Sequence, residues 1–175
     1  RGAEQSFDIS ADLRELSLTA VTVVAAGAKA ILDLPKTLEV LETLGVPVIA
    51  FGQDEFPAFW SRSSGLKAPL RMDNAEDIAA AQLLRRQLGL SGGQLVANPI
   101  PAEAEIPRSV IGPVIERALA DAADRDIAAK EVTPFLLGRI FDLTEGRSLA
   151  ANIALVLNNA RLGAAIARAL ADKRP

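Results

Sequence analysis

The segment Thr19-Ala-Val-Thr-Val-Val-Ala-Ala-Gly-Ala-Lys29 decides the fold, because it joins an apolar strand to a turn and a charged side chain. Its apolar residues run continuously, which is typical of a strand covered on both faces in a parallel sheet. Gly27 then permits a tight turn. Lys29 leaves the end of this strand, where burial disfavours a charged ammonium. The side chain is therefore either an amine that forms an imine with a carbonyl carbon or a helix N-terminal lysine that reaches solvent.

Strand and helix patterns alternate along the first two thirds of the chain, which predicts βαβ units. We expect an α/β fold, layered α/β/α, with a largely parallel or mixed central sheet and a helical C-terminal third. The whole of 1–175 is expected to form a single α/β domain. The expected strands are 19–26, 46–51 and 94–97, and the expected helices are 31–44, 73–90, 107–128, one from Thr133-Pro134 and one capped by Ser148.

Composition limits the chemistry of this 175-residue chain, which is 50% hydrophobic and carries a net charge of −3. Without a basic block, a nucleic-acid polymer is not an expected partner. The absence of cysteine and histidine excludes disulfides, thiolate chemistry and imidazole acid–base catalysis within the chain. A metal would have oxygen ligands, which favours Mg²⁺ or Mn²⁺ over Zn²⁺.

A membrane span or a signal peptide in the sequence would indicate where the protein is located. No apolar run reaches the roughly 18 residues of a membrane span and no signal peptide is visible, so we expect a cytoplasmic protein without a membrane partner. The chain begins at Arg1 and its one methionine is Met72. This predicts a fragment, a processed chain or a trimmed one, with site residues outside it.

Asp8, Ser10 and Asp12 form the first polar group. In an extended segment they share one face, where two carboxylates and a hydroxyl suit a hydrated divalent cation, a sugar or a phosphate. The same residue types commonly cap helices, and capping by Ser10 or Asp12 is the interpretation that they favour.

Two asparagines are candidates for reading a ligand. Asn98 follows the strand at 94–97, at the end where open α/β sheets bind ligands, although Asn98-Pro-Ile-Pro101 is equally a rigid strand exit. Asn152 lies inside an apolar helix, where a buried amide needs a partner. It is a candidate contact for the polar edge of a heterocycle such as an imide.

A series of short motifs runs in order over nearly the whole chain. It includes Arg1-Gly-Ala-Glu4, Ser6-Phe-Asp-Ile-Ser-Ala-Asp-Leu13, Ala26-Gly-Ala-Lys29, Gly45-Val-Pro-Val48, Asp54-Glu-Phe-Pro-Ala-Phe59, Val96-Ala-Asn-Pro-Ile-Pro101, Lys130-Glu-Val-Thr-Pro-Phe-Leu-Leu137 and Ser148-Leu-Ala-Ala-Asn152. Together these stretches resemble the pseudouridine-5′-phosphate glycosidase (indigoidine synthase A-like) family.

The resemblance implies reversible cleavage of the C–C glycosidic bond of pseudouridine 5′-phosphate to uracil and ribose 5-phosphate, by an enzyme classed in nomenclature as a carbon–oxygen lyase. It implies that Lys29 forms an imine with C1′ of the opened ribose and that Asp8 binds Mn²⁺. Ser10, Ala11 and Asp12 match a substrate-binding stretch, and Asn152 matches a contact to the base.

The resemblance also implies what lies outside the chain. A glutamate that protonates the uracil carbon and a lysine that contacts phosphate belong to the family's N-terminal region, so this chain is expected to be the C-terminal part of the enzyme. An N-terminal fragment of the same enzyme is a possible partner, and a homotrimer is the expected assembly.

Two other functions remain open at this point. One is a lysine-dependent aldolase or lyase that forms the same imine with another sugar phosphate and makes no use of uracil. The other is a non-catalytic binding or assembly fragment that lacks the proton donor. Trapping an adduct on Lys29 distinguishes the enzymes from the binding fragment.

Overall fold

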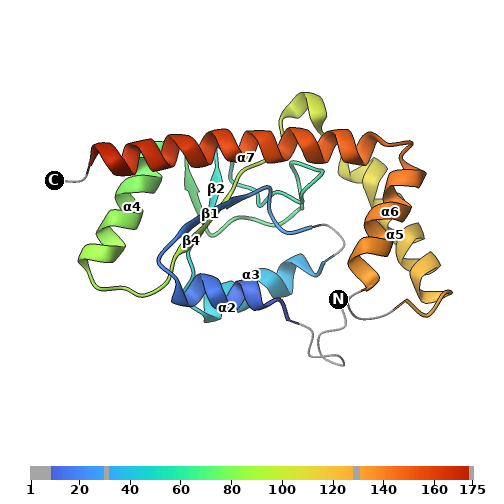
Figure 1. Cartoon of the computed structure of the whole chain (residues 1–175), viewed down its shortest axis with the longest axis horizontal. Helices are drawn as coiled ribbons and strands as arrows, with labels where there is room; N and C mark the ends of the chain where they lie inside the picture. The colour runs from blue at the N-terminus through green and yellow to red at the C-terminus, as the bar shows by residue number, and fades with distance from the viewer. Residues whose placement is uncertain (1–8, 30–31, 128–130, 174–175) are drawn as a thin grey trace.

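The computed structural model describes residues 9–29, 32–127 and 131–173, and these form a layered α/β/α fold (Figure 1). The predicted fold class is confirmed. The elements are α2 (Ala11–Leu18), β1 (Thr22–Ala25), α3 (Leu34–Thr43), β2 (Val48–Phe51), β3 (Leu70–Met72), α4 (Ala75–Gln87), β4 (Gln94–Ala97), the 3-10 turn η1 (Ala102–Ala104), α5 (Arg108–Ala123), α6 (Val132–Leu143) and α7 (Arg147–Asp172).

The central sheet has four strands in the order β1-β4-β2-β3. Every pair of neighbouring strands is parallel, and β4 is fully buried at the centre. Ala97 at the end of β4 is in register with Ala25 of β1 and Ala50 of β2. Because parallel strands all end at one edge, the residues that follow β1, β4 and β2 come together there, where open α/β sheets bind ligands.

Helices cover both faces of the sheet. Figure 1 shows α4 and α7 on one side and α2 and α3 on the other. Ile78 of α4 and Ile166 of α7 join Val96 of β4 in one buried cluster. On the opposite face Leu41 of α3 is completely buried in a cluster with Val48 of β2. Removal of these apolar side chains from water is the main stabilising contribution to the fold.

A third cluster lies beyond the carboxyl edge of the sheet. There α5, α6 and the first turns of α7 pack around Ile140 and Trp60, both nearly inaccessible to solvent. Asp121 of α5 accepts a 2.6 Å hydrogen bond from Arg139 of α6, and this bond holds the pKa of the carboxyl below its ordinary value. This end of the molecule is therefore fixed by packing and by one ion pair between helices.

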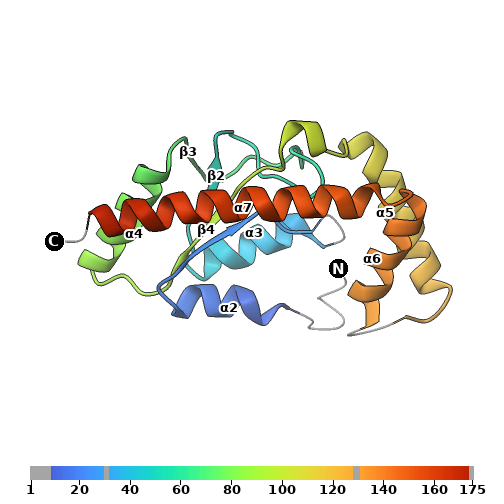
Figure 2. The same cartoon turned by 45° about the horizontal axis from the view of Figure 1, so that its top comes forward.

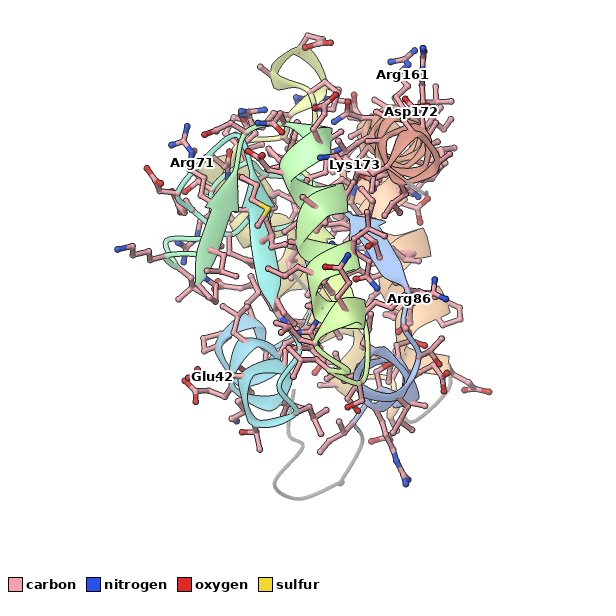
Figure 3. The ribbon with its side chains drawn as sticks, turned by 90° about the vertical axis from the view of Figure 1, so that its left-hand side faces the viewer. Glu42, Arg71, Arg86, Arg161, Asp172 and Lys173 are labelled. Carbon is pink, nitrogen blue, oxygen red and sulfur yellow. The ribbon has the colours of Figure 1, made fainter. Side chains whose placement is uncertain are left out.

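Helix α7 runs the length of the molecule (Figure 2). Within the described residues it is the one helix that is long and apolar enough to cross a membrane by length and composition alone. Such helices also occur in the cores of globular folds, and α7 contacts α4, β1 and α6. Charged residues lie on the outside of the fold: Figure 3 shows Glu42, Arg71 and Arg161 pointing away from it.

The sequence-based boundaries agree with the structure for most elements. The strand predicted at 94–97 is β4 without change, and Gly45 takes a positive φ of 69° directly after α3, as a helix-ending glycine should. The strand predicted at 19–26 is shorter, since its regular part is β1.

Several local predictions are wrong. The helix predicted from Asp73 has Asn74 as its cap, whose side chain accepts from the Asp77 amide at 2.8 Å. The final helix is capped at Gly146 in a left-handed conformation, and Ser148 is buried within its first turn. The favoured capping by Ser10 or Asp12 implied a helix start, but the extent of α2 was not predicted, and neither was β3. Helix α2 has few buried residues, and β3 is a short exposed edge strand inside a long connection.

Candidate functional site

Lys29 lies four residues beyond the end of β1, at the carboxyl edge of the sheet. Its side chain is half-buried, and its carbonyl oxygen accepts a 2.8 Å hydrogen bond from the Leu32 amide. Within the described residues no hydrogen bond or ion pair is recorded for the ammonium group. The amine of Lys29 is therefore not committed to a structural ion pair with any described side chain.

One cavity of about 620 Å³ opens beside this segment, between α2, α3 and the end of β1. We call it the apolar pocket. Its walls include Ala28, the residue before Lys29, together with Phe56 and Leu95. Ser10 and Asp12 also line it. The structure thus brings two of the predicted substrate-binding residues to the same cavity as the residue adjoining Lys29.

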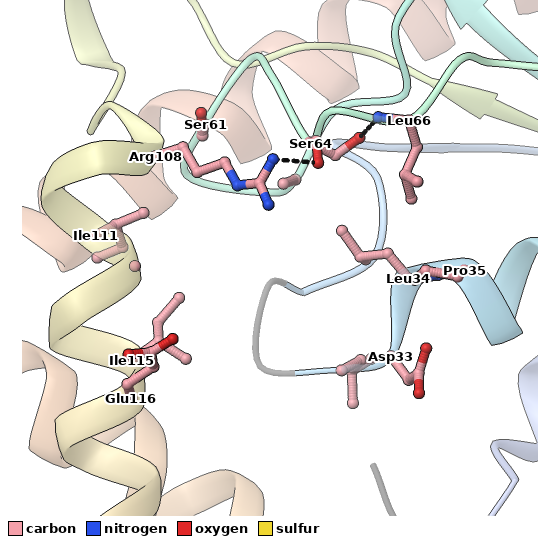
Figure 4. Close-up of a pocket in the computed structure, with 13 residues that line it drawn as sticks. Asp33, Leu34, Pro35, Ser61, Ser64, Leu66, Arg108, Ile111, Ile115 and Glu116 are labelled. Carbon is pink, nitrogen blue, oxygen red and sulfur yellow. Dashed lines mark hydrogen bonds between the residues drawn. The ribbon is translucent and has the colours of Figure 1, made fainter.

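A second cavity of about 610 Å³ lies beside the start of α3, opposite α5 (Figure 4). We call it the arginine pocket, because Arg108 of α5 reaches into it and donates a 2.7 Å hydrogen bond to the Ser64 carbonyl. Ser61 and Glu116 are its other polar walls. Leu32 and Asp33 line both cavities. Leu32 and Asp33 therefore lie between two hollows of similar size, whereas Lys29 itself is a lining residue of neither.

Asp33 is the carboxylate that the two pockets share. It caps α3 by accepting a 3.2 Å hydrogen bond from the Lys36 amide, and Lys36 Nζ lies 3.1 Å from its other oxygen. The backbone hydrogen bond and then the side-chain contact with Lys36 hold the pKa of Asp33 below its ordinary value. A carboxylate capping a helix N-terminus is stabilised by the helix dipole, so Asp33 stays ionised at neutral pH.

Ser10 precedes α2, and Ala11 and Asp12 lie in its first turn. The segment is therefore not the extended strand in which Ser10 and Asp12 would share one face. Ser10 is the N-cap of α2, and its hydroxyl accepts from the Asp12 amide at 3.3 Å. The capping interpretation is therefore confirmed for Ser10. Ala11 is the first residue of α2 and is exposed. The roles of Ser10, Ala11 and Asp12 as substrate contacts stay predictions.

Asn152 lies half-buried on α7 and is not among the described residues that line either pocket. A different asparagine pair joins α7 to the sheet. Asn98, which is 4% exposed directly after β4, donates a 3.1 Å hydrogen bond to the side-chain oxygen of Asn159. Asn158 donates to the Pro99 carbonyl at 3.1 Å. Asn98 is thus committed to a structural contact, as expected of a rigid strand exit.

Asp8, the predicted Mn²⁺ ligand, lies outside the described residues. The described residues contain no group of three or more acidic side chains that could share a metal ion. They do provide carboxylates at the apolar pocket, where Asp12 and Glu39 are lining residues, whereas both oxygens of Asp33 already contact Lys36. A hard divalent cation that keeps several waters and takes one or two carboxylates fits such a donor set.

Asp33, Lys36, Arg108 and Glu116 were not predicted as pocket residues. Asp33 carried one detectable signal, because an Asp followed by Leu34-Pro35 marks a helix cap with proline in the first turn. Arg108 carried none, because its position beside Ser64 depends on a contact across 44 residues of chain.

Comparison with known proteins gives a consistent result. The family model described as indigoidine synthase A like protein matches residues 1–169. Two relatives called pseudouridine-5′-phosphate glycosidase are 76% identical over 98% of this chain in Paracoccus denitrificans and 72% identical over 97% in Jannaschia. In each case the match covers 56% of the relative, so the chain spans about half the length of the curated relatives it matches.

Two solved structures share the fold. An indigoidine synthase A-like protein from Thermotoga maritima has a TM-score of 0.84 at 38% identity, with 95% of this chain and 55% of that chain covered. Prealnumycin C-glycosynthase AlnA in complex with ribulose 5-phosphate has a TM-score of 0.90 at 32% identity, with 97% and 56% covered. The family model matches 169 of the 175 residues, and two related structures have the same fold. The chain belongs to the indigoidine synthase A-like family.

Proposed function

We propose that this chain forms part of a pseudouridine-5′-phosphate glycosidase, which reversibly cleaves the C–C glycosidic bond of pseudouridine 5′-phosphate to uracil and ribose 5-phosphate. The observation that carries the proposal is identity of 60–76% to several glycosidases over nearly the whole chain. The position of Lys29 beyond the end of β1, next to Ala28 of the apolar pocket, supports it in chemical terms.

The proposed chemistry depends on the Lys29 amine. A carbon leaving group has no heteroatom to protonate, so the two-carboxylate mechanism of ordinary glycosidases is insufficient. Attack of the Lys29 amine on C1′ of the nucleotide breaks the C1′–O4′ bond, opens the sugar ring and leaves the amine nitrogen attached to C1′. The nitrogen lone pair then forms the C1′=N bond of an imine as the carbon–carbon bond breaks. The electron pair of that bond goes to the uracil carbon, which takes up a proton, and water hydrolyses the imine to ribose 5-phosphate.

The proposed substrate contacts rest on two kinds of support, their place in a pocket or the family resemblance. Ser10 and Asp12 are proposed substrate contacts, supported by their place in the apolar pocket. Ala11 beside them and Asn152 on α7 are proposed from the family resemblance. The acid that protonates uracil and the phosphate-binding lysine are proposed to lie outside this chain, in the part of the relatives that it does not span.

We propose Mn²⁺ as the cofactor, held by Asp8. When bound, such a cation supplies positive charge to orient a phosphorylated or hydroxyl-bearing substrate. The oxygen-only donors at the apolar pocket support a hard divalent cation over zinc.

A homotrimer and a cytoplasmic location complete the proposal. Four large apolar side chains of α7 are at least half exposed, and a row of this kind is normally covered by another protein surface. These residues are Leu149, Ile153, Val156 and Leu157. Light scattering on the purified chain, extended to the full length of its relatives, is expected to give three times the monomer mass; a monomer at micromolar concentration would rule out the trimer.

Borohydride trapping tests the function directly. The chain, alone and extended with the uncovered residues of the Paracoccus relative, is incubated with ribose 5-phosphate and borohydride, and the intact mass and peptides are measured. We expect one adduct, on Lys29, and none in Lys29→Ala. Lys67→Ala, which removes an exposed lysine of the 53–69 loop, should react like the unmodified chain. Failure of the extended chain to form an adduct at Lys29 would overturn the mechanism.

An aldolase or lyase acting on another sugar phosphate is the second candidate. The structure of the related C-glycosynthase with ribulose 5-phosphate favours it as an alternative, because that ligand is a ketose phosphate. Supplying ribose 5-phosphate with uracil, and then with aldehyde acceptors in place of uracil, separates the two. Pseudouridine 5′-phosphate formation supports the glycosidase, and product with the other acceptors alone supports the aldolase.

A further inference from the structure

The loop that follows β2 contacts the backbone just before Lys29. The amide of Phe59 donates a 2.8 Å hydrogen bond to the carbonyl oxygen of Ala26, the buried residue that follows β1. Phe59 adopts a φ of +64°, a left-handed conformation that bulky residues rarely take. Such a conformation persists only where the surroundings hold it, and it concentrates at functional sites.

Gly27 allows this contact to be so close. Its φ is +81°, and a Cβ added there would lie 1.9 Å from the carbonyl oxygen of Pro57. The same Cβ would lie 3.4 Å from the ring of Phe56. The backbone of the loop therefore lies directly against the backbone that leads to Lys29, with no room for a side chain between them.

The loop itself is anchored to a second segment of the chain. Glu105 accepts hydrogen bonds from the Ser61 hydroxyl at 3.2 Å and from the Arg62 amide at 2.8 Å. The Trp60 carbonyl accepts from the Ile106 amide at 2.9 Å. These contacts join the loop to the segment between η1 and α5, so that the loop cannot shift without breaking them.

We propose that the loop 56–62 is a clamp that positions Lys29, with Phe59 and Gly27 as positioning residues. The inference rests on the proposed function, in which the Lys29 amine attacks the sugar carbon. Phe59 and Gly27 act through the backbone: the hydrogen bond to Ala26 and the close packing at Gly27 fix the chain three and two residues before Lys29. A nucleophile displaced by about 1 Å loses on the order of 100-fold in rate, so such a clamp has a large kinetic effect.

Substitution of two glycines tests the clamp. Gly27→Ala introduces the clash with Pro57, whereas Gly45→Ala is the matched control, because Gly45 also has a positive φ, of +69°, but nothing within 4 Å of an added Cβ. In the extended chain we expect Gly27→Ala to slow adduct formation at saturating ribose 5-phosphate by about 10- to 100-fold. The half-saturating concentration should change less than about threefold. Gly45→Ala should stay within about twofold of the unmodified rate.

A second variant and a second measurement distinguish loss of the clamp from misfolding of the whole chain. Glu105→Ala removes the acceptor of Ser61 and Arg62 without a backbone clash, and it should slow trapping in the same way by about 3- to 10-fold. Amide hydrogen exchange should show that the Phe59 amide loses protection in Gly27→Ala and in Glu105→Ala, while amides of β4 keep theirs.

The outcomes separate the clamp from the proposed function. If the unmodified extended chain forms no adduct on Lys29, the proposed function fails, and the role of the clamp fails with it. If the adduct forms and both Gly27→Ala and Glu105→Ala react at the unmodified rate, the clamp alone is overturned. Equal slowing by Gly45→Ala also overturns it, since strain anywhere would then have the same effect.

Discussion

The indole nitrogen of Trp60 donates a 3.1 Å hydrogen bond to the carbonyl oxygen of Ser148, across 88 residues of chain. Trp60 is 2% exposed and its ring meets that of Phe59 edge to face, with centroids 5.0 Å apart. The single tryptophan of the chain therefore fixes the long loop to the first turn of α7. Ser148 is itself 4% exposed, so the bond joins two buried groups.

Trp60→Phe is expected to lower the free energy of unfolding by about 2–3 kcal/mol, because it leaves a cavity and removes the donor of a buried hydrogen bond. Urea denaturation followed by circular dichroism measures the change. Leu88→Ala, at a side chain that is 65% exposed, is the control and should cost less than about 0.5 kcal/mol. Equal effects of the two substitutions would contradict the role assigned to Trp60.

The amide pair of Asn98 and Asn159 is expected to contribute about 1 kcal/mol of coupling. Asn98→Ala, Asn159→Ala and the double variant form a cycle, and the free energy of unfolding of each gives the coupling. Asn98→Ala alone should cost about 1–3 kcal/mol, since Asn98 is nearly completely buried. A coupling of zero would mean that the 3.1 Å contact adds nothing to stability.

Glu55 predicts a pH dependence of stability. Its carboxylate accepts hydrogen bonds from the Ser63 hydroxyl and the Gly65 amide, and these, the Ser63 bond first, hold its pKa below the ordinary 4.5. The stabilisation is therefore fully present above pH 4.5 and disappears as the pH falls through the lower value of the folded state.

Glu55→Gln should accordingly lower the free energy of unfolding at pH 7 by about 0.5–1 kcal/mol, a small effect because the group is partly exposed. Thermal unfolding from pH 7 downward measures it, and the difference from the unmodified chain should shrink below pH 4.5. Glu42→Gln, at an outward-pointing residue of α3, controls for the loss of one negative charge (Figure 3). A difference that does not change with pH would argue against the hydrogen-bonded carboxylate as its source.

Asp8→Ala is expected to weaken Mn²⁺ binding at least tenfold, because it removes a charged oxygen ligand. Electron paramagnetic resonance of free Mn²⁺ during titration measures binding without reference to activity. Asp172→Ala, at the exposed end of α7, should bind as the unmodified chain does. Unchanged binding in Asp8→Ala would remove Asp8 from the metal site.

Sequence patterns predicted the parts of the fold that depend on local chemistry. The apolar run at 94–97 bounded by glycines and prolines gave β4, and the alternation of strands and helices gave a parallel sheet. The extent of helix α2 was missed, although its cap was not, because its polar residues outnumber the one buried side chain, Leu16. The strand β3 was missed because its exposed residues pair only with β2, which no local pattern reveals.

The candidate site could be predicted only in part, and the roles of its residues stay predictions. The type of Ser10 indicated its place as a helix cap, whereas Lys29, which was chosen because it follows an apolar strand, lines neither pocket. Arg108 and Glu105 could not be found in this way, since they meet Ser64 and Ser61 across more than 40 residues of chain. Contacts of that kind depend on how helices pack on the sheet, which periodicity does not specify.

Helix α7 has a mechanical consequence, since its 26 residues extend about 39 Å. Its first turns put Ala151 and Leu155 into the cluster around Trp60, and its later turns put Leu162 and Ile166 into the cluster around α4. This one helix thus contributes side chains to two buried clusters. Loosening either cluster removes packing contacts from a helix that also supports the other. We therefore expect the two ends of the molecule to unfold in a single cooperative transition rather than independently.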